Sequence, residues 1–468
     1  MPESRSRLQR PPLQRSLPAR ALPWILWALT FHILGIAVLF GYFNLSIKVV
    51  QVIAAWKEIA GLILFVIVVV RAATGWGPRV TVSAADLFAG LWIALAVVFF
   101  ATENVVLRDF IPIKAAIFGV RDAAFFMLFY FVGRATPELG EDYRFMKHAF
   151  AVLSVTSILA IAEQIFVTPQ MLVALGVASY VQNFLGGVAF TQGNVYGLPD
   201  NYWSEMGGHM VRRSGSVFLS GQGFAVVFIV LLPLATLWLL QKGDKTRWTH
   251  RVLYAAIWIG LIATFTRTAI LVAGLQTLVL FATRRRVTGA ALAASLAAGG
   301  LVIGVLVFPS LATFVFETLT WQSGSSVSHL KDWTNGITAF LEQPWGYGLG
   351  TTDQTAVRAG LEPLTADNVY LKYAVELGLP GLVALVGTLA CIGMAGFRAA
   401  TRSITAPARD MGVAVALIIL GVLVYGMTST MFNDPMVGYL VFWLGGTAVT
   451  LAQRAPSPTS SRIALSYA

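Results

Sequence analysis

The chain has 468 residues, of which 57% are hydrophobic and only 12% are charged. In soluble domains roughly a quarter of all residues are charged. The low charged fraction here therefore excludes a soluble enzyme, a disordered chain and a coiled coil. The single cysteine, Cys391, excludes a disulfide framework and a cysteine-based metal site. The net charge of +11 is compatible with nucleic-acid binding, but the distribution of the basic residues along the chain has to be considered first.

Long apolar runs predict an all-α polytopic membrane protein with about twelve transmembrane helices. A transmembrane β-barrel would alternate apolar and polar residues, and these runs are continuous. The expected spans are 21–43, 49–70, 85–101, 115–133, 148–167, 218–240, 252–266, 268–283, 287–309, 378–397, 411–429 and 436–453. The spans on either side of Arg267 are short, so one long helix with Arg267 near mid-membrane is the alternative there.

The basic residues are concentrated in every second connection between the predicted spans. With the N-terminus in the cytoplasm, the cytoplasmic segments are short and hold 22 of the 33 Lys and Arg residues. This is the positive-inside pattern, which attributes the charge to topology and anionic lipid and not to nucleic acid. The apolar run after residue 20 is too long for the core of a signal peptide, so the first helix is expected to remain uncleaved.

The resulting organisation is one membrane domain with two long loops on the outer, periplasmic side. Its parts are a basic cytoplasmic tail (1–20), transmembrane helices 1–5 (21–167), a periplasmic loop (168–217), transmembrane helices 6–9 (218–309), a large periplasmic loop (310–377), transmembrane helices 10–12 (378–453) and a cytoplasmic tail (454–468). Both termini are expected in the cytoplasm, and an active site outside the membrane would have to come from the two loops.

Three arginines on the outer side are candidates for binding an anion. Arg267 interrupts an apolar stretch, where an ionisable group is costly and usually functional, although snorkelling to the interface is the alternative. Arg212 and Arg213 precede the span at 218 and are either an interfacial anchor pair or a phosphate contact at a helix entrance. Guanidinium groups bind phosphate bidentately, which favours a phosphate-bearing ligand.

The second loop is predicted to contain an amphipathic helix. Apolar residues recur at helical spacing between Ser328, a suitable N-cap, and Pro344, a stop. They are Leu330, Trp333, Ile337, Phe340 and Leu341. Gly346, Gly348 and Gly350 then predict a mobile turn, whose spacing alone is weak evidence for a phosphate-binding loop.

The stretch that starts at Asp367 predicts a further short helix. Asp367 is either its N-cap or a functional carboxylate, and Gly378 is expected to end it. Lys372 and Glu376 have the spacing of an i, i+4 ion pair. The histidines of the two loops, His209 and His329, and the loop carboxylates have no metal-binding spacing, so neither a metal nor another cofactor is expected.

Three segments in this order resemble the O-antigen ligase/Wzy-type O-antigen and exopolysaccharide polymerase superfamily of GT-C-like bacterial membrane glycosyltransferases. They are the Arg-Ser-Gly stretch at Arg213, the Thr-Arg-Thr-Ala junction at Arg267, and the Pro-Trp-Gly-Tyr-Gly-Leu-Gly turn with the Asp-Asn and Gly-Leu-Pro-Gly that follow it. These segments cover about 210–385, and the layout of spans extends the likeness to most of the chain.

The resemblance implies a glycosyltransferase that moves a glycan from an undecaprenyl-diphosphate carrier to an acceptor hydroxyl at the periplasmic face of the bacterial inner membrane. No metal or cofactor takes part in the implied reaction. The acceptor is another lipid-linked repeat in the polymerases and lipid A–core in the ligases, as part of lipopolysaccharide and cell-envelope biosynthesis. The implied partners are therefore the donor, a glycan or lipid A–core acceptor and membrane lipid, without nucleic acid.

The family's motifs also imply roles for particular residues. The positions of Arg213 and Arg267 hold the diphosphate, and Arg212 is a further candidate for this contact. The family has a histidine as base where this chain has Asp367, a departure that favours a polymerase over a ligase, with His329 as the second candidate base. Additional candidates for substrate contacts are Asn368, Tyr370 and Lys372.

A transporter is the alternative from another functional class. Transporters place their sites near mid-membrane, on broken helices. Intramembrane polar residues that keep this alternative open are Lys57, Glu58, Arg121, Asp122 and Glu163.

Overall fold

A computed structural model of the chain describes residues 16–76, 80–106, 111–186, 196–199, 202–206, 209–283, 316, 320, 324–365 and 367–456. Eight helical segments in these ranges are long and apolar enough to cross a membrane. They are α3 (Ile47–Ala54) with α4 (Trp56–Ala73), α5 (Ala84–Val106), α6 (Ile113–Arg134), α7 (Arg144–Phe166), α10 (Gly221–Lys242), α17 (Val369–Arg402), α18 (Ala406–Tyr425) and α19 (Pro435–Arg454). The structure thus confirms an all-α polytopic membrane protein.

The expected number of about twelve spans is not confirmed. A ninth span results if α1 (Leu17–Thr30) and α2 (His32–Gly41), which meet at an angle of 45°, count as one. The helices α11 (Trp248–Ala263) and α12 (Arg267–Thr283) have 16 and 17 residues, fewer than the roughly 20 that a straight span requires. The span expected at 287–309 lies outside the described residues.

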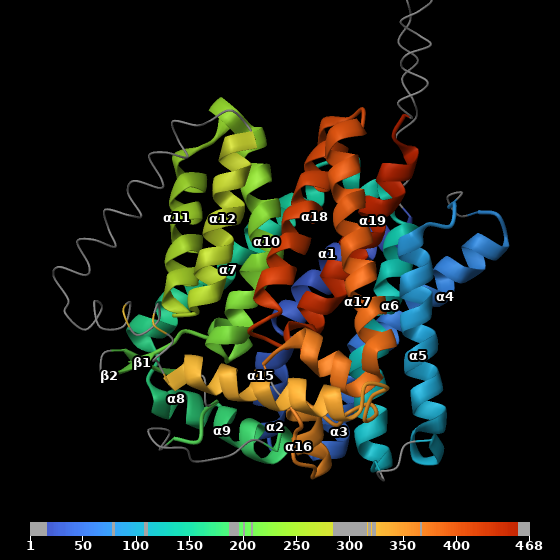
Figure 1. Cartoon of the computed structure of the whole chain (residues 1–468). Helices are drawn as coiled ribbons and strands as arrows, with labels where there is room; N and C mark the ends of the chain where they lie inside the picture. The colour runs from blue at the N-terminus through green and yellow to red at the C-terminus, as the bar shows by residue number, and fades with distance from the viewer. Residues whose placement is uncertain are drawn as a thin grey trace, which may run out of the picture.

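The helices α11 and α12 stand upright side by side and are joined by residues 264–266 (Figure 1). The alternative of one continuous helix is therefore wrong. Arg267 is the first residue of α12, directly after the turn that joins the two helices.

The centre of the bundle is formed by α10 and α19, while α4 and α5 lie at its edge. In the most apolar 18 residues of each span, the buried share is 83% for α10 and 89% for α19, against 17% for α3–α4 and 22% for α5. The contact of α19 with α6 depends on glycine, because a Cβ atom at Gly446 would lie 2.0 Å from the Tyr130 carbonyl oxygen. Small residues of this kind let membrane helices approach closely.

Short elements gather at one end of the bundle (Figure 1). They are α8 (Pro169–Ala174), α9 (Val177–Ser179), β1 (Trp203–Met206), β2 (His209–Arg212), α15 (Gly324–Glu342) and α16 (Asp353–Ala359). β1 and β2 form an antiparallel pair in which Trp203 is opposite Arg212. Single turns of 3-10 or π helix occur at Pro137–Gly140, Tyr180–Phe184, Ser216–Phe218, Gly243–Lys245 and Met431–Asn433.

The amphipathic helix of the second loop is confirmed as α15, which lies across the end of the bundle (Figure 1). It begins at Gly324, before the expected Ser328, and ends at Glu342, just before Pro344. Val327, Leu330, Ile337 and Leu341 form an exposed apolar stripe, while Gly336 and Ala339 are buried on the opposite side. The helix therefore packs on the bundle by its small residues.

The last membrane segment before α18 differs from the expected one. α17 begins at Val369 and not at 378, and Gly378 does not end it but breaks it, with φ 68° and ψ −168°. The break exposes backbone groups that pair with the preceding loop, since Leu379 N donates to Pro344 O at 2.8 Å and Gly348 N donates to Glu376 O at 3.1 Å.

The glycine turn at 346–350 is not the mobile turn that the sequence predicts. Gly346, Gly348 and Gly350 are buried and have φ values of 100°, 108° and 79°. A Cβ atom at Gly350 would lie 2.2 Å from the Ala115 carbonyl oxygen of α6. Glycine is required there for a left-handed backbone and a close approach, so the turn is a packed connection between α6 and α17.

Gly446→Ala is expected to destabilise the protein by about 1–3 kcal/mol, because the added methyl group overpacks the α6–α19 contact. Gly274→Ala on α12 is the matched control, since nothing lies within 4 Å of its Cβ position. Alanine there should preserve stability or raise it by up to about 1 kcal/mol through helix propensity. Thermal unfolding in detergent measures both variants, and an equal effect of the two substitutions would contradict the close contact.

Candidate functional site

Arg213 is held against the turn between α11 and α12. Its Nε donates to the Thr264 carbonyl oxygen at 2.8 Å and its Nη2 donates to Thr266 Oγ1 at 2.6 Å. The start of α10 leaves room for this side chain, because a Cβ atom at Gly221 would lie 2.9 Å from Arg213 Nε. The guanidinium is thus fixed in orientation by groups more than fifty residues away in the chain.

Arg267 comes from the same turn and faces the same region. Burial lowers the pKa of Arg213, and the positive charge of Arg267 lowers it further. Arg267 also acts electrostatically on His329 of α15. The structure therefore brings Arg213, Arg267 and His329 together, although 116 residues separate the first from the last in the sequence.

Arg212 points in another direction, as expected for neighbouring residues at a strand end. Its Nη2 donates to the Glu163 carbonyl oxygen at 2.7 Å and its Nε donates to Gln164 Oε1 at 3.3 Å. A further hydrogen bond reaches the Val167 carbonyl oxygen. Arg212 thus binds the C-terminal carbonyl groups of α7, which is the anchor interpretation of the arginine pair, and Arg213 alone of the two reaches the turn.

The carboxylate of Glu163 holds the segment that follows Arg213. It accepts hydrogen bonds from Ser214 Oγ at 2.5 Å and from Ser216 N at 2.7 Å. This side chain is buried near the end of α7. Through these hydrogen bonds Glu163 positions the segment that carries Arg213. The sequence analysis did not assign this role to Glu163.

The N-cap of α17 is Asn368 and not Asp367. Asn368 Oδ1 accepts hydrogen bonds from Tyr370 N and Leu371 N, both at 3.0 Å. Asp367 precedes the cap with a left-handed φ of 53°, a conformation that aspartate tolerates better than most residues. The capping interpretation of Asp367 is therefore wrong, and its carboxyl group is left for another role.

Asp367 lies next to the second candidate base. Its Oδ2 is 3.9 Å from His329 Nδ1, too far for a hydrogen bond, and the exposed fractions of the two side chains are 42% and 20%. Partial burial, with added repulsion from Asp353 and Asp332, raises the pKa of Asp367 to about 7. Burial lowers the pKa of His329. The carboxylate of Asp367 can therefore accept a proton near neutral pH.

The remaining sequence candidates are occupied by structural contacts. Lys372 is 1% exposed, and its Nζ lies 3.6 Å from Glu376 Oε1, which confirms the expected i, i+4 pair. Tyr370 OH donates to the Leu423 carbonyl oxygen of α18 at 3.0 Å. Together with the capping role of Asn368, these contacts support the architecture around Asp367. The side chain of His209 lies outside the described residues.

Sequence reasoning missed one residue that connects the two halves of the site. Tyr425, the last residue of α18, interacts electrostatically with both Arg213 and Asp367. It is 1% exposed, and its position at the end of an apolar helix offered little to distinguish it from a core residue. Asp332 and Asp353 were also not singled out, because they are distant in sequence from Asp367 and meet it only in the fold.

The arrangement combines two fixed positive charges with a carboxyl group that titrates near neutral pH. Preorganised guanidinium groups can stabilise negative charge that develops on a departing phosphate. A carboxylate with a raised pKa can take a proton from an attacking hydroxyl group. These are the two requirements for group transfer from a phosphate-activated donor.

A comparison with known families covers the core of this site. Residues 252–386 match the family model described as O-Antigen ligase, a range that holds Arg267, His329 and Asp367. Arg213 precedes the matched range, and no curated protein matches the chain. The match confirms the resemblance drawn from the sequence motifs. Residues 252–386 are thus similar to the O-antigen ligase domain, which supports a relationship of this membrane protein to the O-antigen ligase/Wzy-type superfamily.

Proposed function

We propose that the protein is a polysaccharide polymerase of the bacterial inner membrane that uses an undecaprenyl-diphosphate-linked glycan as donor. The observation that carries the proposal is the convergence of Arg213 and Arg267 with the titratable Asp367. Arg213 and Asp367 both act electrostatically on Tyr425, and His329 is acted on by Arg267 and lies 3.9 Å from Asp367. The family match supports a glycosyltransferase-like enzyme of this kind. The positive-inside pattern supports a periplasmic position for the site and cytoplasmic termini.

In the proposed reaction, the acceptor hydroxyl attacks the anomeric carbon of the donor glycan. The bond between that carbon and the diphosphate oxygen breaks, and its electron pair leaves with the carrier diphosphate. Arg213 and Arg267 stabilise the growing negative charge, and the Asp367 carboxylate receives the hydroxyl proton. A direct displacement of this type inverts the anomeric carbon, and its charge stabilisation is supplied by the arginines.

The proposal favours a polymerase over a ligase because Asp367 stands where the family's ligases have histidine. Purified protein in liposomes, given the lipid-linked repeat alone, is expected to produce a ladder of longer glycans. Transfer only after lipid A–core is added would instead identify a ligase. Movement of intact donor across the membrane without any new glycosidic bond would identify a transporter.

Arg213→Ala and Arg267→Ala should each lower the rate of transfer about 30- to 1000-fold, which corresponds to about 2–4 kcal/mol of lost transition-state stabilisation. Lysine at either position should restore only part of the rate, because it cannot bind phosphate bidentately. The control is Arg144→Ala, whose side chain is 75% exposed at the start of α7. Near-normal transfer by both alanine variants, measured with equal amounts of folded protein, would remove these arginines from the mechanism.

The rate of transfer should rise with pH through a midpoint near 7, because only the deprotonated Asp367 accepts a proton and its pKa is raised to about 7. Asp332→Asn removes a nearby negative charge, so it should move this midpoint to lower pH. Asp367→Asn should abolish most turnover without loss of stability. A pH–rate profile that is unchanged in Asp332→Asn would argue against Asp367 as the titrating group.

Two further variants separate the base from its neighbours. Asn368→Ala should cost about 1 kcal/mol of stability through the lost helix cap, whereas Asp367→Asn should not. His329→Ala tests the second candidate base in the same assay. If Asp367→Asn turns over normally and His329→Ala does not, His329 is the base.

A further inference from the structure

A cavity of about 250 Å³ lies between α4 and α6, near their C-terminal ends. Its walls are mainly apolar, with Phe65 and Val68 from α4 and Phe131 from α6. The Phe65 and Phe131 rings meet edge to face, with centroids 6.3 Å apart. In Figure 1 the helix α4 lies at the edge of the bundle away from α15, and the cavity lining contains none of the candidate site residues, so the cavity is separate from the candidate site.

The cavity is open toward the surface that would face lipid. Val69 and Val80, which line it, are 48% and 42% exposed. The bundle edge formed by α4 and α5 is the least buried part of the spans. Ligand pockets for whole small molecules are usually about 300–1,000 Å³, so this one has room for a segment of one acyl chain.

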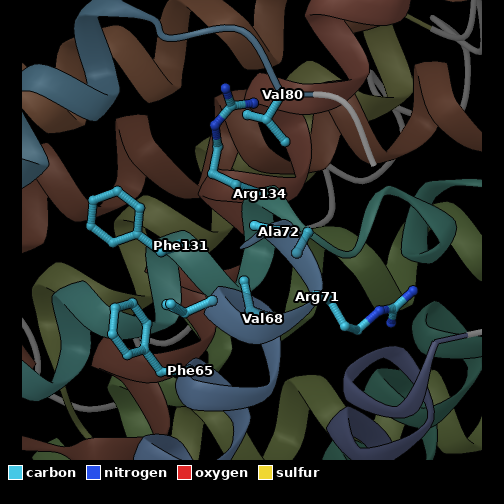
Figure 2. A pocket seen from close by; sticks show the side chains of 9 residues that line it. Phe65, Val68, Arg71, Ala72, Val80, Phe131 and Arg134 are labelled. Carbon is cyan, nitrogen blue, oxygen red and sulfur yellow. The ribbon is translucent and has the colours of Figure 1, made fainter. Parts of the chain in front are cut away.

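Two arginines line the cavity, and they differ in how they are paired. Arg134 is 3% exposed, donates to Asp86 Oδ1 at 2.8 Å and donates to Thr450 Oγ1 at 2.6 Å. Arg71, in the last turn of α4, donates one long hydrogen bond of 3.4 Å to the Trp76 carbonyl oxygen. In Figure 2 the Arg71 guanidinium extends away from the two phenyl rings. The cavity therefore has an apolar end and a basic end.

We propose that this cavity binds an anionic phospholipid, with an acyl chain against Phe65 and Phe131 and the headgroup phosphate on Arg71. An acyl chain gains no hydrophobic free energy by leaving the bilayer for another apolar surface, so the headgroup must decide which lipid is retained. An arginine near the end of a span lies at the depth of the lipid phosphates. Its charge selects an anionic headgroup over a zwitterionic one.

The test uses the full-length protein in liposomes with a phosphatidylglycerol that carries a photoreactive acyl chain. The label is expected within 65–72, at Val80 and within 131–135. Unlabelled phosphatidylglycerol should compete for this label about 5-fold better than phosphatidylcholine, the preference expected from one arginine near an anionic surface. Equal competition by the two lipids, or labelling elsewhere on the chain, would overturn the proposal.

Substitutions at each end of the cavity test which end causes the preference for the anionic lipid. Arg71→Ala should bring the competition ratio close to one, while Arg402→Ala, which removes an exposed arginine from the last turn of α17, should leave it unchanged. Ala72→Phe should fill the cavity from its exposed side and reduce labelling by every lipid. Stronger competition by polyprenyl phosphate than by phosphatidylglycerol would identify a carrier lipid as the occupant and would also overturn the proposal.

Discussion

The turn at 264–266 between α11 and α12 is the constraint on which the candidate site depends. It accepts both hydrogen bonds of the Arg213 side chain described above, and it ends at Arg267. One short backbone segment thus sets two positive charges in a common region. Two like charges repel each other, so holding them close together costs folding free energy. Such an arrangement favours the binding of an anion, which both charges attract.

In contrast to these two arginines, several charged side chains inside the bundle are paired with opposite charges. Lys57 Nζ lies 3.0 Å from Glu58 Oε1, and Arg121 Nη2 lies 2.8 Å from Asp122 Oδ1. Asp122 also accepts a hydrogen bond from Thr355 of α16. These residues kept the transporter interpretation open, but ionisable groups in the membrane are also retained as mutual partners. Arg121 Nε also lies 4.0 Å from Glu58 Oε1, so these contacts connect α4, α6 and α16 and give the charges a structural role.

The sequence predicted the features that depend on local patterns. Composition and apolar runs predicted the polytopic helical class, and periodicity predicted α15. The sequence-based prediction was wrong where the backbone conformation depends on contacts with groups distant in the chain. The glycines at 346–350 resemble a mobile turn in sequence, and only their contacts with α6 and the broken α17 make them rigid. The alternative that Asp367 caps α17 was wrong by one residue, because Asp367 and Asn368 are both suitable caps and only Asn368 accepts the hydrogen bonds of the first turn.

The candidate site was predicted in part for the same reason. Motif resemblance pointed to Arg213, Arg267 and Asp367, and the fold brings their surroundings together. It could not separate Arg212 from Arg213, since adjacent residues at the end of a strand point to opposite sides. Nor could it find Tyr425, whose relation to Arg213 and Asp367 depends on how α18 packs.

Asp367 stands where the resemblance to the family implies a histidine, and this difference has a physical consequence. An exposed aspartate titrates near pH 4 and is a weak base at neutral pH, whereas imidazole titrates near 6.5. Burial and the charges of Asp353 and Asp332 raise the pKa of Asp367 to about 7, so this carboxylate reaches the basicity of an imidazole. The two neighbouring acids are far apart in sequence and converge only in the fold. A carboxylate in this position therefore needs burial, and after it the acidic neighbours, to reach the basicity that histidine has by itself, and these surroundings form part of the proposed catalytic site.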